Sequence, residues 1–237
     1  DLAEQIFQDT LRACNSIGVT LVGGHTEITN GLSRPIVVGQ MLGEVDKKRL
    51  VRADGARKGD VIVLTKGIAI EGTAVIARER EAEMLQILGE QTFRRCRNFM
   101  QEPGISVLKE ALAASQYGSV HAMHDPTEGG LATALHELAR AAGVGLLVRA
   151  EAVPVFAETQ AICNHYHLDP MGLIASGALL IILAANELEN LLSRLQSEGI
   201  EAAEIGEVTE KSKGVKLLTA DGLYDLPLYE QDELTRI

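Results

Sequence analysis

Residues 124–131 carry the densest set of chemically useful groups in the sequence. They read His124-Asp125-Pro126-Thr127-Glu128-Gly129-Gly130-Leu131 and stand before an apolar pattern at helical spacing. Side-chain oxygens and backbone N–H groups converge at such a helix start, and helix N-termini of this kind commonly bind phosphate groups. The alternative is structural: Asp125 or Thr127 caps the helix, and the paired glycines allow close packing. On local grounds alone the structural interpretation is favoured.

Two other glycine-containing segments between predicted elements, here called joints, also allow either a phosphate-binding or a purely structural interpretation. The first follows an apolar run and reads Gly23-Gly24-His25-Thr26-Glu27. Glycine there would let the backbone approach a phosphate and Glu27 could hold magnesium, whereas the alternative is a tight turn with a solvated His and Glu. The second joint, Lys66 to Thr73, contains Gly72 and offers Lys66 to an anion. Neither a Walker pattern nor a three-glycine dinucleotide pattern occurs, and a helix start explains this joint equally well.

The composition excludes several classes of protein. A net charge of −11 argues against nucleic-acid binding, and 3% aromatic residues without Trp supply few base-stacking platforms. The longest apolar run, 178–185, is too short to span a membrane. Cys14, Cys96 and Cys163 lie far apart, which argues against a disulfide framework or a zinc site and favours a reducing cytoplasm. Cys163 is expected in the core.

We place a domain boundary between residues 45 and 46. Residues 1–45 are expected to be the end of another domain, with an opening helix and strands at 19–22 and 36–45. Residues 46–237 are expected to form an α+β domain, a mixed sheet with helices packed on it. Its expected strands are 61–65, 120–123, 146–149, 179–183 and 204–208, followed by a hairpin at Asp221-Gly222. Its expected helices are 71–79, 91–100, 105–114, 131–142, 155–165 and 187–197, with 91–100 and 105–114 paired on one side of the sheet.

Taken in order, the glycine-containing joints resemble the aminoimidazole ribonucleotide (AIR) synthetase superfamily, most closely its hydrogenase-maturation branch, the HypE type. The specific motif is Asp125-Pro126-Thr127 with Gly129-Gly130-Leu131-Ala132-Thr133-Ala134-Leu135, which looks like the signature at the helix of the family's C-terminal domain. Gly23-Gly24-His25-Thr26 resembles the motif that ends the N-terminal domain, in a form similar to that of selenophosphate synthetase. Shorter matches in family order are Gly72 with Ala77-Arg78-Glu79, Gly177-Ala178-Leu179-Leu180, and Ile205-Gly206-Glu207-Val208.

The resemblance implies an ATP-dependent enzyme that activates a substrate oxygen by phosphoryl transfer, with magnesium on the phosphates and paired N-terminal domains in a homodimer. Residues 1–45 would then be the remnant of an ATP-binding domain, and residues 46–237 an AIR synthase-like C-terminal domain. The residues that would face phosphate are Gly23, Gly24, His25 and Thr26, with Glu27 at the metal. The residues that would line the opposite side of the cleft are Asp125, Thr127, Glu128, Gly129, Gly130, Gly72 and Thr73. The substrate, a small molecule or a group carried by a protein, is left unassigned.

Three departures from the family limit what carries over. The family's acidic metal-binding segment lies upstream of Asp1, so residues 1–237 alone are expected to bind ATP poorly and to be inactive. The usual Arg of the motif is Glu128 here, which reverses a charge at the cleft. The HypE type ends in a Cys that accepts a carbamoyl group, whereas this sequence ends at Ile237, so that thiocarboxamide is not the expected substrate.

Two alternatives to the ATP-dependent enzyme therefore stay open. The first is a non-catalytic paralogue that acts as a dimeric binding or assembly module, which Glu128 and the absence of a tail Cys motivate. The second is a magnesium-dependent phosphohydrolase that uses Glu27, Asp125 and Glu128, provided that these carboxylates converge.

Overall fold

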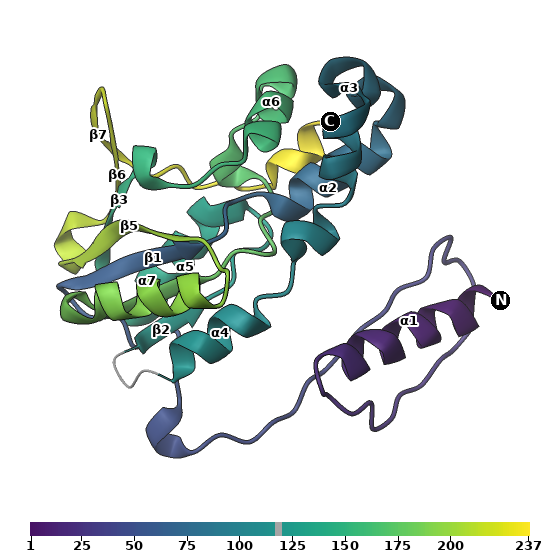
Figure 1. Ribbon diagram of the computed structural model, residues 1–237, viewed down its shortest axis with the longest axis horizontal. Coiled ribbons are helices and arrows are strands. Elements are labelled where there is room, and N and C mark those ends of the chain that lie inside the picture. The colour runs from purple at the N-terminus through teal and green to yellow at the C-terminus, as the bar shows by residue number, and fades with distance from the viewer. Residues whose placement is uncertain (117–119) are drawn as a thin grey trace. The chain divides into compact units, whose positions relative to one another are not determined.

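The computed structural model describes residues 1–116 and 120–237. The chain divides into two compact units, Asp1–Asp46 and Lys47–Ile237, and each is described by itself. Figure 1 labels the helices and strands. All the secondary structure that positions the 124–131 turn belongs to the second unit.

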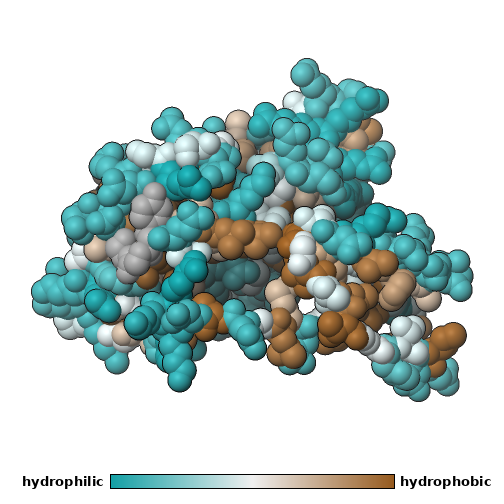
Figure 2. Space-filling view, turned by 60° about the horizontal axis from the view of Figure 1, so that its bottom comes forward, coloured by the Kyte–Doolittle hydropathy of each residue, from teal (hydrophilic) through white to brown (hydrophobic). Residues whose placement is uncertain are grey.

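The first unit contains helix α1, Leu2–Ser16, and extended chain after it. Asp1 caps α1 by accepting a hydrogen bond from the Glu4 amide at 2.8 Å. The strands predicted at 19–22 and 36–45 are not formed: a strand requires a hydrogen-bonded neighbour, and neither segment has one among the described residues. The apolar side chains of 36–45 are exposed as a result, for example Val38 at 91%, whereas Val19 and Leu21 are partly buried. Figure 2 shows that hydrophobic side chains gather on one part of the molecular surface.

In the second unit the described residues form one seven-stranded sheet in the order β2-β4-β1-β5-β3-β6-β7. The strands are β1 Asp60–Thr65, β2 Val120–His124, β3 Gly145–Arg149, β4 Leu180–Ala184, β5 Ala202–Thr209, β6 Val215–Thr219 and β7 Gly222–Asp225. Neighbouring strands are antiparallel except for the parallel pair β3 and β6, so the predicted mixed α+β sheet is confirmed. The predicted hairpin at Asp221-Gly222 joins β6 to β7.

The helices of this unit are α2 Ile70–Glu79, α3 Glu81–Arg97, α4 Leu108–Ser115, α5 Gly130–Ala142, α6 Ala157–Tyr166 and α7 Leu188–Ser197. Helix α5 packs on one face of the sheet and α4 and α7 pack on the other, and Figure 1 shows the sheet among these helices. Side chains alternate along a strand, so Ile62 and Leu64 of β1 pack in the core with α5, while Val61 and Val63 pack in the core with α4 and α7. Burial on both faces explains why the middle of β1, residues 61–64, is entirely apolar.

A third hydrophobic cluster joins α2, α3 and α6. Helix α3 runs through residues 81–90, which the sequence analysis treated as a charged connection, and it bends at Gly89, where φ is +74°. The predicted pairing of 91–100 with 105–114 is wrong, because α3 packs on α2 and α6 whereas α4 packs on α7. No helix in the described part of the chain is both long and apolar enough to cross a membrane.

Candidate functional site

The glycine pair Gly129-Gly130 forms the turn between β2 and α5. Both residues have positive φ, +75° and +65°, a conformation that glycine adopts without the steric cost of a Cβ. Gly129 is the N-cap of α5 and no side chain caps it from within the turn, so capping by Asp125 or Thr127 is wrong. His124, at the end of β2, bonds Glu137 of α5 at 2.8 Å and ties the strand end to the helix.

The backbone of a second segment lies against Gly130. A Cβ built on Gly130 would come within 2.4 Å of the Met171 carbonyl oxygen and 2.9 Å of the Leu173 nitrogen. A Cβ on Gly72 would come within 2.5 Å of the Leu173 side chain. Residues 171–173 therefore fit between the glycine of α2 and the glycine that starts α5, and close packing is one function of these glycines.

The amides of both glycines already have protein acceptors. The Gly129 N–H donates to Oδ2 of Asp232 at 2.7 Å, and the Gly130 N–H donates to the Thr127 carbonyl at 3.0 Å. Oδ1 of Asp232 also accepts from the amides of Leu234 and Ile174, at 2.8 and 3.2 Å. The carboxylate of Asp232, in the C-terminal segment 229–237 (the tail), therefore occupies the position that an anion would take at the start of α5.

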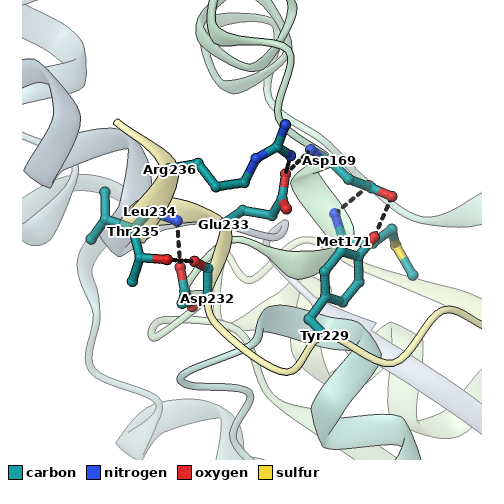
Figure 3. A network of polar contacts seen from close by, with 8 residues as sticks. All are labelled: Asp169, Met171, Tyr229, Asp232, Glu233, Leu234, Thr235 and Arg236. Atoms are coloured by element: carbon teal, nitrogen blue, oxygen red, sulfur yellow. Dashed lines mark hydrogen bonds and ion pairs between the residues drawn. The ribbon is translucent and has the colours of Figure 1, made fainter.

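A network of polar contacts holds this tail in place (Figure 3). The Tyr229 hydroxyl donates to the Asp169 carboxylate, and burial together with this carboxylate raises the pKa of Tyr229. Glu233 is only 6% exposed. Its Oε2 accepts hydrogen bonds from the Asp169 amide at 2.8 Å and from the Arg236 guanidinium at 2.6 Å. The sequence signal for this anchor was an Asp before a helical turn, since Asp232 caps Glu233–Arg236, but its contact with Gly129 spans 103 residues of sequence.

Three side chains of the 124–131 turn face solvent. Those of Thr127 and Glu128 are exposed, and the Asp125 side chain is 64% exposed, with its carboxylate 3.9 Å from the His124 ring. A hydroxyl and two carboxylates at one turn can accept from or donate to a polar ligand. This exposed set is what the turn offers a ligand in the observed arrangement.

The structure places the second glycine joint in the interior. The Thr73 hydroxyl is fully buried and lies 2.7 Å from the Thr159 hydroxyl, and Gly72 is buried against Leu173. Lys66 is also engaged: its ammonium pairs with Glu110 at 2.9 Å and donates to the Gly104 carbonyl. These groups satisfy one another, so they stabilise the unit rather than face a ligand.

The loop from Gly23 to Glu27 belongs to the first unit and is exposed throughout. His25 lies 3.9 Å from Glu27, whose side chain is 74% exposed. No group of three or more His, Cys, Asp or Glu residues suited to a metal ion exists among the described residues. The described residues therefore do not by themselves form a metal site.

The buried cysteines lack the properties of nucleophiles. Burial, with the nearby charges of Asp169 and Glu233, raises the pKa of Cys163 to about 12, and burial raises the pKa of Cys96 to about 11. We expect a thiol reagent at pH 8 to modify Cys14, which is partly exposed, and to leave Cys96 and Cys163 unmodified until urea unfolds the protein. Site-resolved mass spectrometry measures this, and equal labelling of Cys163 and Cys14 in native protein would contradict the burial described here.

Comparison with known proteins defines the class to which this fold and turn belong. Residues 57–217 match the family model described as AIR synthase related protein, C-terminal domain. The chain belongs to the AIR synthase related family. This stretch contains the whole 124–131 turn, β1 to β5 and the helices from α2 to α7.

Among relatives within that class, the chain is similar to HypE proteins. The carbamoyl dehydratase HypE of Cupriavidus necator is 28% identical over 218 residues, which are 89% of this chain and 58% of that protein. The selenide, water dikinase of Geobacter sp. (strain M21) is 32% identical over 223 residues, 87% of this chain and 63% of that protein. A crystal structure of HypE in complex with ATP has a TM-score of 0.61 and 27% identity, and covers 82% of this chain and 57% of its own. This chain spans about three fifths of the length of these curated relatives.

Proposed function

We propose that the full-length protein is an ATP-dependent synthetase-like enzyme that activates a substrate oxygen by phosphoryl transfer. In such a step the oxygen forms a bond to the γ-phosphorus of ATP while the bond from that phosphorus to the β,γ-bridging oxygen breaks, and ADP leaves. The observation that carries this proposal is the similarity in fold and sequence to HypE in complex with ATP. The dikinase among the relatives supports phosphoryl chemistry in the same family.

The exposed side chains of the 124–131 turn are our candidates for ligand contact. Asp125 and Thr127 carry oxygens that face solvent, whereas the glycine amides are occupied by Asp232 and Thr127. In the observed arrangement a nucleotide or substrate would therefore meet side chains first, and the glycines act by shaping the turn. Glu128 makes this turn more acidic than the family motif. We therefore expect the part of the ligand that lies here to carry hydroxyl or amino donors.

The loop from Gly23 to Glu27 is our proposed phosphate-facing segment. Open space around both glycines, where no atom lies within 4 Å of a built Cβ, leaves their backbone accessible to a phosphate. The first unit has no buried residue of its own, and Val22, Ile28 and Val38 are more than nine-tenths exposed. A homodimer that covers these side chains is part of the proposal.

Nucleotide-dependent thermal stabilisation of the full-length protein tests this function. A ligand at 100 times its Kd stabilises a protein by about 2.7 kcal/mol, so ATP is expected to raise the melting temperature measurably. Asp125→Ala is expected to weaken this shift, whereas Asp225→Ala, at an 83% exposed side chain of β7, should leave it unchanged. An unchanged melting temperature at every ATP concentration would rule out the proposed enzyme.

A second candidate, a non-catalytic dimeric module, is favoured by one observation. The Asp232 carboxylate accepts the hydrogen bond of the Gly129 amide at the start of α5, as expected if this turn has only a structural role. The same experiment separates the two candidates, because the module predicts no effect of ATP on the full-length protein.

A further inference from the structure

A pocket of about 390 Å³ lies where the end of α2 meets the end of α3. Its lining residues are Arg78, Arg94, Arg97, Asn98 and Gln101. They come from α2, from α3 and from the segment directly after α3, so the pocket shares no residue with the 124–131 turn. Arginine and amide side chains without a lining carboxylate give the pocket the donors that an oxyanion requires.

Arg78 is exposed like the other lining residues, but neutral acceptors position its guanidinium and no described carboxylate pairs with it. Its Nε and Nη2 donate to the Arg97 carbonyl oxygen at 3.2 and 3.0 Å, and Nη1 lies 3.3 Å from the Met100 sulfur. Among the residues that the structure describes, no carboxylate lies within 4 Å of this guanidinium. A guanidinium fixed by neutral acceptors keeps its full charge, and little rotamer freedom is lost when a ligand binds.

The other two arginines have partners that a ligand can replace. Arg94 pairs with Glu90, their side chains being 75% and 60% exposed, and Arg97 lies 3.5 Å from Glu81 at similar exposure. Exposed pairs of this kind contribute little to stability, so a ligand can replace one carboxylate at low cost. The three guanidiniums have two carboxylate partners, Glu90 and Glu81, which leaves an excess of positive charge at the pocket in a chain whose net charge is −11.

The charge balance also indicates which anion fits. The C-terminal end of α3 carries a partial negative charge of about half an elementary charge, which repels an anion. One guanidinium would therefore attract a singly charged ligand only weakly. A phosphate or diphosphate carries more charge and enough oxygens to engage several guanidiniums in paired hydrogen bonds. Asn98 and Gln101 supply neutral amide donors at the same wall.

We propose that this pocket, the arginine pocket, binds a small anion through a phosphate or diphosphate group. The site lies outside the turn assigned to ATP-dependent chemistry, and its existence does not depend on that function. The group could belong to inorganic phosphate species or to an organic phosphate ester. Both sources share the chemistry that the three guanidiniums recognise.

Calorimetric titration of the full-length protein with pyrophosphate tests the arginine pocket. We expect binding that weakens with added salt, and at least tenfold weaker binding for Arg78→Gln. Arg94→Gln, a change at an exposed side chain that does not endanger folding, should weaken binding several-fold. The matched control is Arg140→Gln, at an exposed arginine near the end of α5, which should stay within twofold of the wild type.

Three outcomes would overturn the proposal: no binding of pyrophosphate to the wild type, equal binding by the wild type and both pocket variants, or loss of binding in Asp125→Ala but not in Arg78→Gln. The last would place the anion at the 124–131 turn. Titration with AMP distinguishes the sources, because tighter binding than pyrophosphate with the same dependence on Arg78 indicates an organic phosphate. Equal or weaker AMP binding with that dependence indicates an inorganic one, and either result supports the pocket.

Discussion

Gly130→Ala is expected to destabilise the protein by about 2–5 kcal/mol. The left-handed conformation at φ +65° costs a residue with a Cβ about 1–2 kcal/mol. The new Cβ would also lie 2.4 Å from the Met171 carbonyl and 2.8 Å from that of Leu173, and these backbone atoms can move only if the 171–173 segment moves. Overpacking of this kind adds about 1–3 kcal/mol. The midpoint of urea unfolding measures the loss.

Gly143→Ala is the matched control at the other end of the same helix. Gly143 is the C-cap of α5 with φ +68°, and a Cβ there meets no atom within 4 Å. It should lose only the conformational part, about 1–2 kcal/mol. The difference between the variants isolates the contact with residues 171–173, and equal losses at both positions would show that this contact is not tight in solution.

Asp232→Ala is expected to destabilise the protein by about 2–4 kcal/mol, because hydrogen bonds to a charged acceptor contribute about 1.5–3 kcal/mol each and are not additive. The variant removes the acceptor of three amides, those of Gly129, Ile174 and Leu234. Gly129 is buried, so its N–H would lose its acceptor without full compensation from water. Unfolding midpoints measure the stability, and faster hydrogen exchange of the Gly129 amide should accompany the loss.

Two variants bracket this result. Asp232→Asn keeps one acceptor oxygen, but its NH₂ group must face either the Gly129 amide or the other two, so we expect an intermediate loss. Asp225→Ala removes an 83% exposed carboxylate from a surface pair with Lys216 and should cost less than about 1 kcal/mol. If Asp232→Ala were as mild as Asp225→Ala, the tail carboxylate would not be holding the turn.

Local sequence signals predicted the elements around the turn because each signal acts over a few residues. The apolar spacing of 131–142 and the closing Gly143 predicted α5 within one residue, and Asp221-Gly222 predicted the hairpin of β6 and β7. The apolar residues 61–64 likewise predicted the strand β1. Hydrophobic periodicity was sufficient here because tertiary packing agrees with local propensity.

The contacts that define the site could not be read in the same way. Asp232 reaches Gly129 across 103 residues, and the Arg78 guanidinium reaches the Arg97 carbonyl across 19. The family resemblance implied that Thr73 lines the cleft, yet its hydroxyl pairs with that of Thr159 in the interior. The segments 19–22 and 36–45 have strand composition without a strand partner among the described residues, which local pattern alone cannot reveal.

Hydrogen exchange of the full-length protein with and without saturating ATP tests the central claim most directly. We predict that peptides covering 23–27 and 124–131 both gain protection, because both segments are proposed to contact the bound nucleotide. A peptide from the hairpin of β6 and β7 should not change. Unaltered exchange of both proposed segments, in a sample shown to be saturated with ATP, would contradict the assignment of the glycine turns to nucleotide binding.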